Sequence, residues 1–206
     1  ISQFCKNTNI VTMLGENKTS EKEIKSKLNK NIKLNYISKK NSPTIVKKRF
    51  IDYISYNKVL GVYNINDEPL NDVDENKLQE ILRKTLPKFD LVIVSDYGHG
   101  FISKKTSDLI CKKSNFLALN AQINSSNIGY HSMRKYKNVD CLIINEREIR
   151  HELRDRSNDL KILIKKLSKD QKIKNLIVTR GKNGAILYNL KENSFLFSDA
   201  FAKKIV

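Results

Sequence analysis

Three short polar clusters each follow an apolar run that is typical of a buried strand. They are residues 96–100 (DYGHG), 145–148 (NERE) and 179–184 (TRGKNG). In open α/β sheets, ligands bind beyond the carboxyl ends of the strands. Carboxylates and amides can bind hydroxyls or hydrated Mg²⁺, and glycine lets the backbone approach a phosphate closely. Together, the three clusters predict a ligand-binding edge.

Each cluster also has a purely structural interpretation. A glycine after a strand often marks only a turn, and Asp96 can cap such a turn. Asn145 with Glu148 can cap the start of a helix. The residue types alone leave both interpretations open.

A separate basic strand offers a second group of candidates. Residues 42–49 read SPTIVKKR, and strand alternation places Lys47 and Arg49 on one face and Lys48 on the other. Lys and Arg suit phosphate oxygens, so Thr44, Lys47 and Arg49 are candidates to contact a substrate phosphate. Solvated charges on an exposed strand are the alternative.

The second two-thirds of the chain alternates strands with helices. Helical spacing is seen around Leu78–Leu86 and Leu160–Leu167, and Ser103 can cap a third helix. Strands that are apolar on both faces favour a mostly parallel α/β sheet, with the body at 72–206. The expected strands are 91–95, 116–119, 141–144, 175–179, 185–188 and 193–197.

The first third has a different pattern. A strand is predicted at 9–14, followed by a helix that Ser20 and Glu23 open as a capping box. Three β-rich runs come next, and they predict a small antiparallel sheet. We interpret residues 33–66 as a β-rich lid or clasp inserted near the start of the chain. The three runs are 33–38, 44–53 and 58–65.

Composition bounds the class of protein. The 206 residues are 39% hydrophobic and 30% charged, which is typical of a globular chain. The net charge is +17, but the lysines are spread over every predicted element, which favours solvated surface charge over a nucleic-acid partner. A nucleic-acid-binding domain is an alternative that only the charge suggests. No apolar run is long enough to span a bilayer, and no membrane partner is expected. The three cysteines lack zinc spacing and indicate reduced thiols and a cytoplasmic location.

In their order along the chain, these motifs resemble the ribokinase-like (PfkB) carbohydrate kinases, and most closely the heptose-7-phosphate kinases of ADP-heptose synthesis. Residues 42–49 resemble their Pro-Thr-x-x-Lys-x-Arg strand, and 90–100 (DLVIVSDYGHG) their Ser-Asp-Tyr-x-x-Gly strand end. Residues 145–148 fit Asn-x-x-Glu, and 176–188 resemble the Val-Thr-x-x-x-x-Gly nucleotide loop. The resemblance implies a three-layer α/β/α fold with a mostly parallel sheet and a small β lid.

The resemblance implies ATP- and Mg²⁺-dependent phosphoryl transfer to a sugar or sugar-phosphate hydroxyl. It assigns ATP and Mg²⁺ to one set of residues, with Glu148 reaching the metal through water. That set is Asn145, Glu146, Arg147, Glu148, Thr179, Gly181 and Gly184. It assigns the sugar to a second set, which is Thr44, Lys47, Arg49, Asp96, Gly98, Gly100 and Asn120.

Two positions depart from the heptose kinases. The amide-rich residues 120–127 stand where those kinases carry Asp-Pro-Lys-Gly, and His99 stands where they usually place Lys. Residues 201–206 align with the segment before the family's Asp-x-x-Gly-Ala-Gly-Asp signature, which supplies the general base. We therefore expect a fragment that lacks both ends of the domain, with the base beyond Val206 and no activity alone.

Three further expectations concern the parent protein. The family's lid can pair with a second subunit, so a homodimer through residues 33–66 is expected. A fused nucleotidyltransferase domain would make the parent bifunctional. The alternative is a non-catalytic regulatory module that binds nucleotide or sugar and has lost the base.

Overall fold

A computed structural model describes residues 1–123 and 131–201. These residues divide into two compact units. The first contains residues 1–81 and 99–101, and the second contains 82–98 and the described residues from 102 onward. The α2 helix, Asp72–Thr85, runs from the first unit into the second, and a short helical turn, η1 (Leu86–Lys88), follows it.

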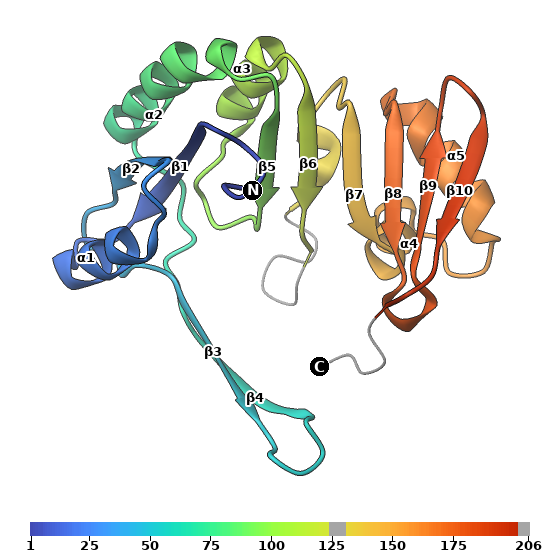
Figure 1. Cartoon of the computed structure of the whole chain (residues 1–206), viewed down its shortest axis with the longest axis horizontal. Helices are drawn as coiled ribbons and strands as arrows, with labels where there is room; N and C mark the ends of the chain where they lie inside the picture. Colours follow the sequence, from blue (N-terminus) through green and yellow to red (C-terminus); the bar gives the residue numbers. More distant parts are fainter. Residues whose placement is uncertain (124–130, 202–206) are drawn as a thin grey trace. The chain divides into compact units, whose positions relative to one another are not determined.

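The second unit is built on one six-stranded sheet in the order β10-β9-β8-β7-β6-β5 (Figure 1). Strands β5 to β8 run parallel, and β9 and β10 add an antiparallel hairpin at one edge. The mostly parallel sheet confirms the prediction. The bounds are β5 Val92–Asp96, β6 Leu117–Ala121, β7 Cys141–Asn145, β8 Asn175–Thr179, β9 Ala185–Asn189 and β10 Ser194–Ser198.

Three helices belong to the same unit. They are α3 (Lys104–Lys113), α4 (Glu146–Leu153) and α5 (Leu160–Gln171). Two of them contact the sheet, α4 at β7 and β8 and α5 at β8. Ser103 caps α3 as predicted, because its side chain accepts a hydrogen bond from the Thr106 backbone N–H. The stripe of α5 around Leu163 and Leu167 is buried, and α5 contacts β8. Burying each such leucine stabilises the fold by about 1.5–3 kcal/mol.

The first unit contains a parallel strand pair. Strand β1 (Thr8–Leu14) pairs with β2 (Ile32–Ser38), and α1 (Lys18–Lys27) connects them. The antiparallel pairing predicted for the run at 33–38 is therefore wrong. A ten-residue helix between the strands gives the chain the length that a parallel crossover needs.

The predicted start of α1 is also wrong. Asn17, rather than Ser20, is the N-cap, and its side chain accepts a hydrogen bond from the Thr19 backbone N–H at 2.8 Å. Asn is as good an N-cap as Ser, so the earlier residue starts the helix and Ser20 becomes its third residue.

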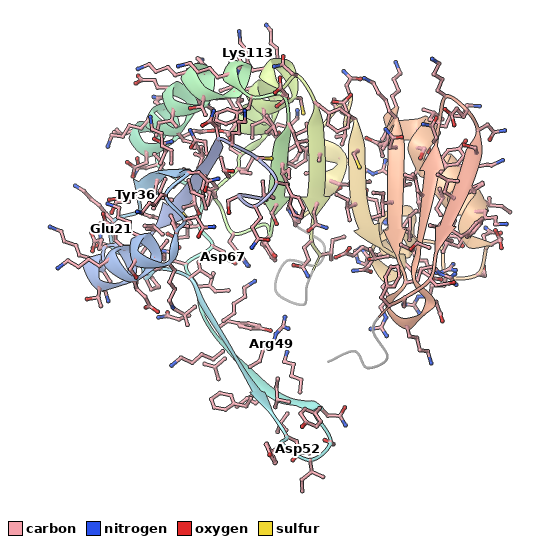
Figure 2. All side chains as sticks on the ribbon, viewed as in Figure 1. Glu21, Tyr36, Arg49, Asp52, Asp67 and Lys113 are labelled. Atoms are coloured by element: carbon pink, nitrogen blue, oxygen red, sulfur yellow. The ribbon has the colours of Figure 1, made fainter. Side chains whose placement is uncertain are left out.

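The remaining strands of the first unit form a hairpin. Strands β3 (Val46–Ile51) and β4 (Lys58–Asn64) pair antiparallel, which confirms that part of the prediction. Figure 1 shows them as a long two-stranded ribbon, and Figure 2 shows Arg49 along it and Asp52 at its turn. Every residue of β3 is exposed. A lone two-stranded ribbon is only marginally stable in water, and a binding partner that covers its side chains would stabilise it. The exposed side chains are therefore candidates for binding.

Candidate nucleotide and sugar site

The strand ends that the three polar clusters follow all lie in the second unit. Asp96, Asn145 and Thr179 are the last residues of β5, β7 and β8, and these strands are parallel. The polar clusters therefore follow strand ends at the same edge of the sheet, as the sequence predicted. Asn145 and Thr179 are direct register partners, which places the NERE cluster beside the nucleotide-loop motif.

At this edge, the backbone pairing between β6 and β7 stops early, and a side-chain hydrogen bond connects the two strands instead. The ladder between them ends at Leu119 and Leu142, whereas the ladder between β7 and β8 continues to Asn145. The Asn120 side-chain amide donates to the Ile143 carbonyl at 3.0 Å. Asn120 thus has a structural partner, and residues 124–127 of the amide-rich loop lie outside the described residues.

Asn145 and Glu148 form a complete capping box at the start of α4. The Asn145 side chain accepts from the Glu148 backbone N–H at 2.9 Å, and Glu148 Oε2 accepts from the Asn145 backbone N–H at 2.9 Å. Glu148 Oε1 accepts from the Ile123 backbone N–H at 3.1 Å. The helix-cap interpretation is therefore correct, and it leaves a ligand role possible because each carboxylate oxygen has a second lone pair.

Burial raises the pKa of Glu148 above its usual value, although backbone N–H groups of Asn145 and Ile123 favour the charged form. Within residues 1–123 and 131–201 no group of three or more His, Cys, Asp or Glu side chains could hold a metal. An all-protein Mg²⁺ cage is therefore not formed by these residues. The donors present fit a hydrated Mg²⁺ contacted through water, because Mg²⁺ usually keeps several of its waters.

Glu146 lies between two arginines. It pairs with Arg150 of α4 at 3.0 Å and with Arg180 of the β8–β9 loop at 3.1 Å. Burial alone would raise the pKa of Glu146, but the hydrogen bonds from both arginines outweigh it and lower the pKa overall. Arg147 is exposed and has no ion pair among the described residues. The sequence analysis did not single out Arg150 or Arg180.

The predicted nucleotide loop is a tight connection between β8 and β9. It contains a short helical turn, η3 (Gly181–Asn183), and the Arg180 N–H donates to the Gly184 carbonyl at 2.8 Å. Gly184 has φ of 75°, and a Cβ there would lie 1.9 Å from the Ser198 carbonyl oxygen. Gly184 is thus required by the loop itself, independently of any nucleotide.

Asp96, the last residue of β5, is buried in an ion pair. Its Oδ2 accepts from the Tyr136 hydroxyl and lies near Lys135 Nζ, both at 2.7 Å, while Oδ1 accepts from the Gly98 N–H at 2.9 Å. Burial would raise the pKa of Asp96, but Lys135 and the hydrogen bonds lower it overall. The predicted turn-capping role is confirmed by the Gly98 contact. Lys135 and Tyr136 were missed because they are about 40 residues away in sequence.

The other predicted sugar-binding residues belong to the first unit. Thr44 Oγ1 accepts from the Gly15 N–H at 3.0 Å, which ties the start of the hairpin to the end of β1. Gly100 has φ of 75°, and a Cβ there would lie 2.1 Å from the Glu68 carbonyl oxygen. Lys47 lies across from Tyr63 with its ammonium 5.7 Å from the ring centroid. The register confirms that Lys47 and Arg49 share one face and Lys48 the other.

One surface hollow lies away from this edge. It has a volume of about 290 Å³ and is lined by Lys174, Asn175, Asn189, Leu190 and Lys191. Asn175 begins β8 and Asn189 ends the antiparallel β9, so the hollow is at the opposite edge of the sheet. Lys174 is paired with Asp140 at 2.6 Å. The hollow therefore has no part in the predicted site.

Comparison with family models decides the relationship. The model of the "pfkB family carbohydrate kinase" matches residues 2–206. The chain belongs to the pfkB family of carbohydrate kinases. Among the residues described, no helix is long and apolar enough to cross a membrane.

Curated relatives of this pfkB chain are named bifunctional protein HldE. The HldE of Blochmanniella pennsylvanica is 29% identical over 170 residues, which are 81% of this chain and 34% of that protein. The HldE of Nitratiruptor sp. is 24% identical over 156 residues, which are 74% of this chain and 32% of that protein. The match therefore spans about a third of the length of these relatives.

Solved structures show that the pfkB chain has a ribokinase-like α/β fold. Ribokinase from Giardia lamblia superposes with a TM-score of 0.72 at 14% identity, over 96% of this chain and 61% of that chain. Phosphofructokinase-2 from Escherichia coli, in complex with fructose-6-phosphate, gives 0.72 at 12% identity, over 97% of this chain and 65% of that chain. The predicted fold class is thereby confirmed.

Proposed function

We propose that this chain is part of an ATP-dependent kinase that phosphorylates a hydroxyl of a sugar or sugar phosphate. The observation that carries the proposal is the family match over residues 2–206. The convergence of Asn145, Glu148 and the Thr179–Gly184 loop at one sheet edge supports it. A heptose phosphate is the proposed acceptor, because residues 42–49 and 90–100 resemble the corresponding motifs of heptose-7-phosphate kinases.

Phosphoryl transfer depends mainly on positioning and on stabilising charge around the transferred group. In the proposed site, Asn145, Glu146, Arg147 and Glu148 line the ATP phosphates. Mg²⁺, when bound with ATP, would neutralise charge on the phosphate oxygens. Glu148 would orient a water on that ion, while its two backbone N–H contacts hold the carboxylate in place. Thr179, Gly181 and Gly184 would lie against the nucleotide.

The acceptor side of the proposal follows the motifs that resemble those of the heptose kinases. Asp96, Gly98, Gly100 and Asn120 would hold the sugar, and Thr44, Lys47 and Arg49 would contact its phosphate. The basic face of the hairpin supports the second assignment. Lys47 and Lys58 both lie over the Tyr63 ring, and Lys58 lowers the pKa of the Tyr63 hydroxyl. This arrangement concentrates positive charge on one side of the ribbon, where a phosphate would be attracted.

The proposal also includes two partners. The apolar face of the hairpin carries Val46, Phe50, Leu60 and Val62, which are 40%, 53%, 53% and 48% exposed. Lys48 lies on the same face. We propose that a second copy covers this face in a homodimer. A fused nucleotidyltransferase domain is proposed for the parent protein, and the relatives' description as bifunctional supports it.

The proposal does not use Asp96 or Glu148 as the general base. Asp96 is held in an ion pair with Lys135, and Glu148 is assigned to the hydrated Mg²⁺. These 206 residues contain no Asp-x-x-Gly-Ala-Gly-Asp signature, the segment that supplies the base in the family, so they are predicted to have no kinase activity alone.

The test is a coupled assay of ADP release with Mg²⁺, ATP and a panel of sugars and sugar phosphates that includes heptose 7-phosphate. The 206-residue chain is expected to give no turnover. The same chain joined to an Asp-x-x-Gly-Ala-Gly-Asp segment of a curated relative is expected to phosphorylate at least one acceptor. Turnover by the chain alone would contradict the assignment of the base, and failure of the joined chain would favour a regulatory module.

A further inference from the structure

Arg180, in the nucleotide-loop motif, is hydrogen-bonded through Nε of its guanidinium group only, among the residues that the structure describes. Arg180 directly follows Thr179, and Glu146 directly follows Asn145, the register partner of Thr179. The two charged side chains therefore extend the pairing of β7 and β8 beyond the last ladder residues. Arg180 Nε donates to Glu146 Oε2 at 3.1 Å, and the Arg180 side chain is 31% exposed.

The rest of the Arg180 guanidinium is available. Among the described residues, its two terminal nitrogens meet no hydrogen-bond acceptor, and Nε carries its one ion pair. A guanidinium has five N–H donors in a planar fork, so fixing Nε leaves the terminal fork oriented and open. Such a fork matches two oxygens of a phosphate.

Arg150 also pairs with Glu146, but its guanidinium uses a terminal nitrogen in that pair. Its Nη2 donates to Glu146 Oε1 at 3.0 Å, and its Nη1 donates to the Asn158 carbonyl at 3.0 Å. Arg150 is thus occupied on both sides by protein acceptors. Glu146 keeps its charge, since its pKa is lowered, and one carboxylate facing two guanidinium groups leaves a net positive charge at this edge.

We propose that Arg180 binds a phosphate group of the nucleotide through its terminal fork and that Glu146 is the positioning residue that holds it. The inference rests on the proposed function for the identity of the phosphate. It changes the role of Glu146, which acts through Arg180 rather than lining the ATP site. It also separates Arg180 from Arg150, which stabilises α4 and the loop after it.

The first test is calorimetric binding of tripolyphosphate, Mg·ATP and adenosine to the 206-residue chain. Arg180→Ala is expected to weaken tripolyphosphate and Mg·ATP about 10- to 100-fold, because charge-assisted hydrogen bonds are lost, and to leave adenosine unchanged. Arg180→Lys is expected to lose most of the same affinity, since an ammonium keeps the charge without the fork.

Lys182→Ala is the matched control. Lys182 is an exposed residue of the same loop with the same charge. It is expected to change the affinity for tripolyphosphate less than about 3-fold, as a single screened surface charge would. Equal losses in Lys182→Ala and Arg180→Ala would overturn the proposal, because a general positive field would then explain binding. Unchanged affinity in a folded Arg180→Ala would overturn it as well.

The positioning role of Glu146 is tested by a double-mutant cycle. Glu146→Gln alone is expected to weaken Mg·ATP binding, and in the Arg180→Ala background it is expected to have no further effect. Additive losses would show that Glu146 does not act through Arg180 and would overturn that role. Thermal unfolding of each variant shows whether a loss of affinity comes from a loss of fold.

Failure of the proposed function and of this inference can be told apart. If the chain binds tripolyphosphate through Arg180 but does not bind Mg·ATP, the phosphate fork is supported and the nucleotide function is overturned. If it binds Mg·ATP equally with and without Arg180, only the inference is overturned. If it binds none of the three probes, both are overturned.

Discussion

The Glu148 carboxylate caps α4 and is also the proposed contact to hydrated Mg²⁺. Glu148→Gln separates the two roles, because a Gln at this position can keep the capping box while the charge is lost. We predict that the variant loses the Mg²⁺ dependence of ATP binding. Calorimetry with and without Mg²⁺ measures it, and an unchanged dependence on Mg²⁺ would contradict the proposed role.

The stability of the same variant provides the control. Because burial raises the pKa of Glu148 in the fold, protonation favours the native state, and this contribution is lost as pH rises through the raised pKa. Glu148→Gln does not titrate, but its amide can accept only one of the two backbone N–H groups that Glu148 accepts. The stability of the wild type relative to the variant should therefore rise as the pH falls from about 7 toward the usual pKa of 4.5.

Asp96 is the buried charge whose loss should cost the most stability. Asp96→Asn leaves Lys135, which is 20% exposed, without its carboxylate, and we predict a loss of about 2–3 kcal/mol in the free energy of unfolding. Tyr136→Phe removes only the hydroxyl contact and should cost about 1 kcal/mol. Urea unfolding measures both. Equal stability of Asp96→Asn and the wild type would show that the ion pair is not stabilising.

The pH dependence of the Asp96 effect has the opposite sign to that of Glu148. The pKa of Asp96 is lowered in the fold, so its contribution is present above the usual pKa of 3.8 and is lost as pH falls through the folded pKa. The difference between wild type and Asp96→Asn should therefore shrink at acid pH.

At the scale of elements, the β3–β4 hairpin has two chemically different faces. Register places Phe50 opposite Leu60 on the apolar face and Lys47 opposite Tyr63 on the basic face. Phe50→Ser with Leu60→Ser is predicted to convert the proposed homodimer into a monomer, because it removes the apolar surface that a partner would bury. Sedimentation velocity measures this change.

Ile54 is a suitable control for the hairpin prediction. It is 87% exposed and lies in the turn at the end of the hairpin, outside both strands. Ile54→Ser removes a comparable apolar side chain without altering the face that carries Phe50. It should leave the oligomeric state unchanged. A wild-type chain that sediments as a monomer at all concentrations would contradict the proposed partner.

The sequence predicted the elements of the second unit well because each signal there is local. Apolar strands, the Ser103 cap and the period of α5 are all visible within a few residues. The pairing of β1 with β2 was not predicted, since strand direction depends on partners that the local pattern does not name. Among site residues, Asn145 and Glu148 were visible from their spacing as a capping box.

Long-range side-chain partners could not be predicted from the sequence. Lys135 and Tyr136 reach Asp96 across about 40 residues, and Arg180 reaches Glu146 across 34. Nothing in the local pattern distinguishes these side chains from other solvated lysines and arginines. The folded sheet decides their partners, because it brings the strand ends to one edge.

At the scale of the whole molecule, the net charge of +17 suits a protein whose proposed ligands are anions. The charge alone does not locate a site, since positive residues occur on both edges of the six-stranded sheet. The opposite edge carries the hollow lined by Lys174 and Lys191. The central claim is that the nucleotide binds at the carboxyl edge, between the end of β7 and the loop after β8.

Amide chemical-shift mapping of the 206-residue chain with Mg·ATP tests this claim most directly. We predict saturable shift changes that are largest at Asn145–Glu148 and Thr179–Gly184. Little change is predicted at the hollow around Lys174–Lys191. Absence of saturable changes, or changes centred on the hollow, would contradict the account.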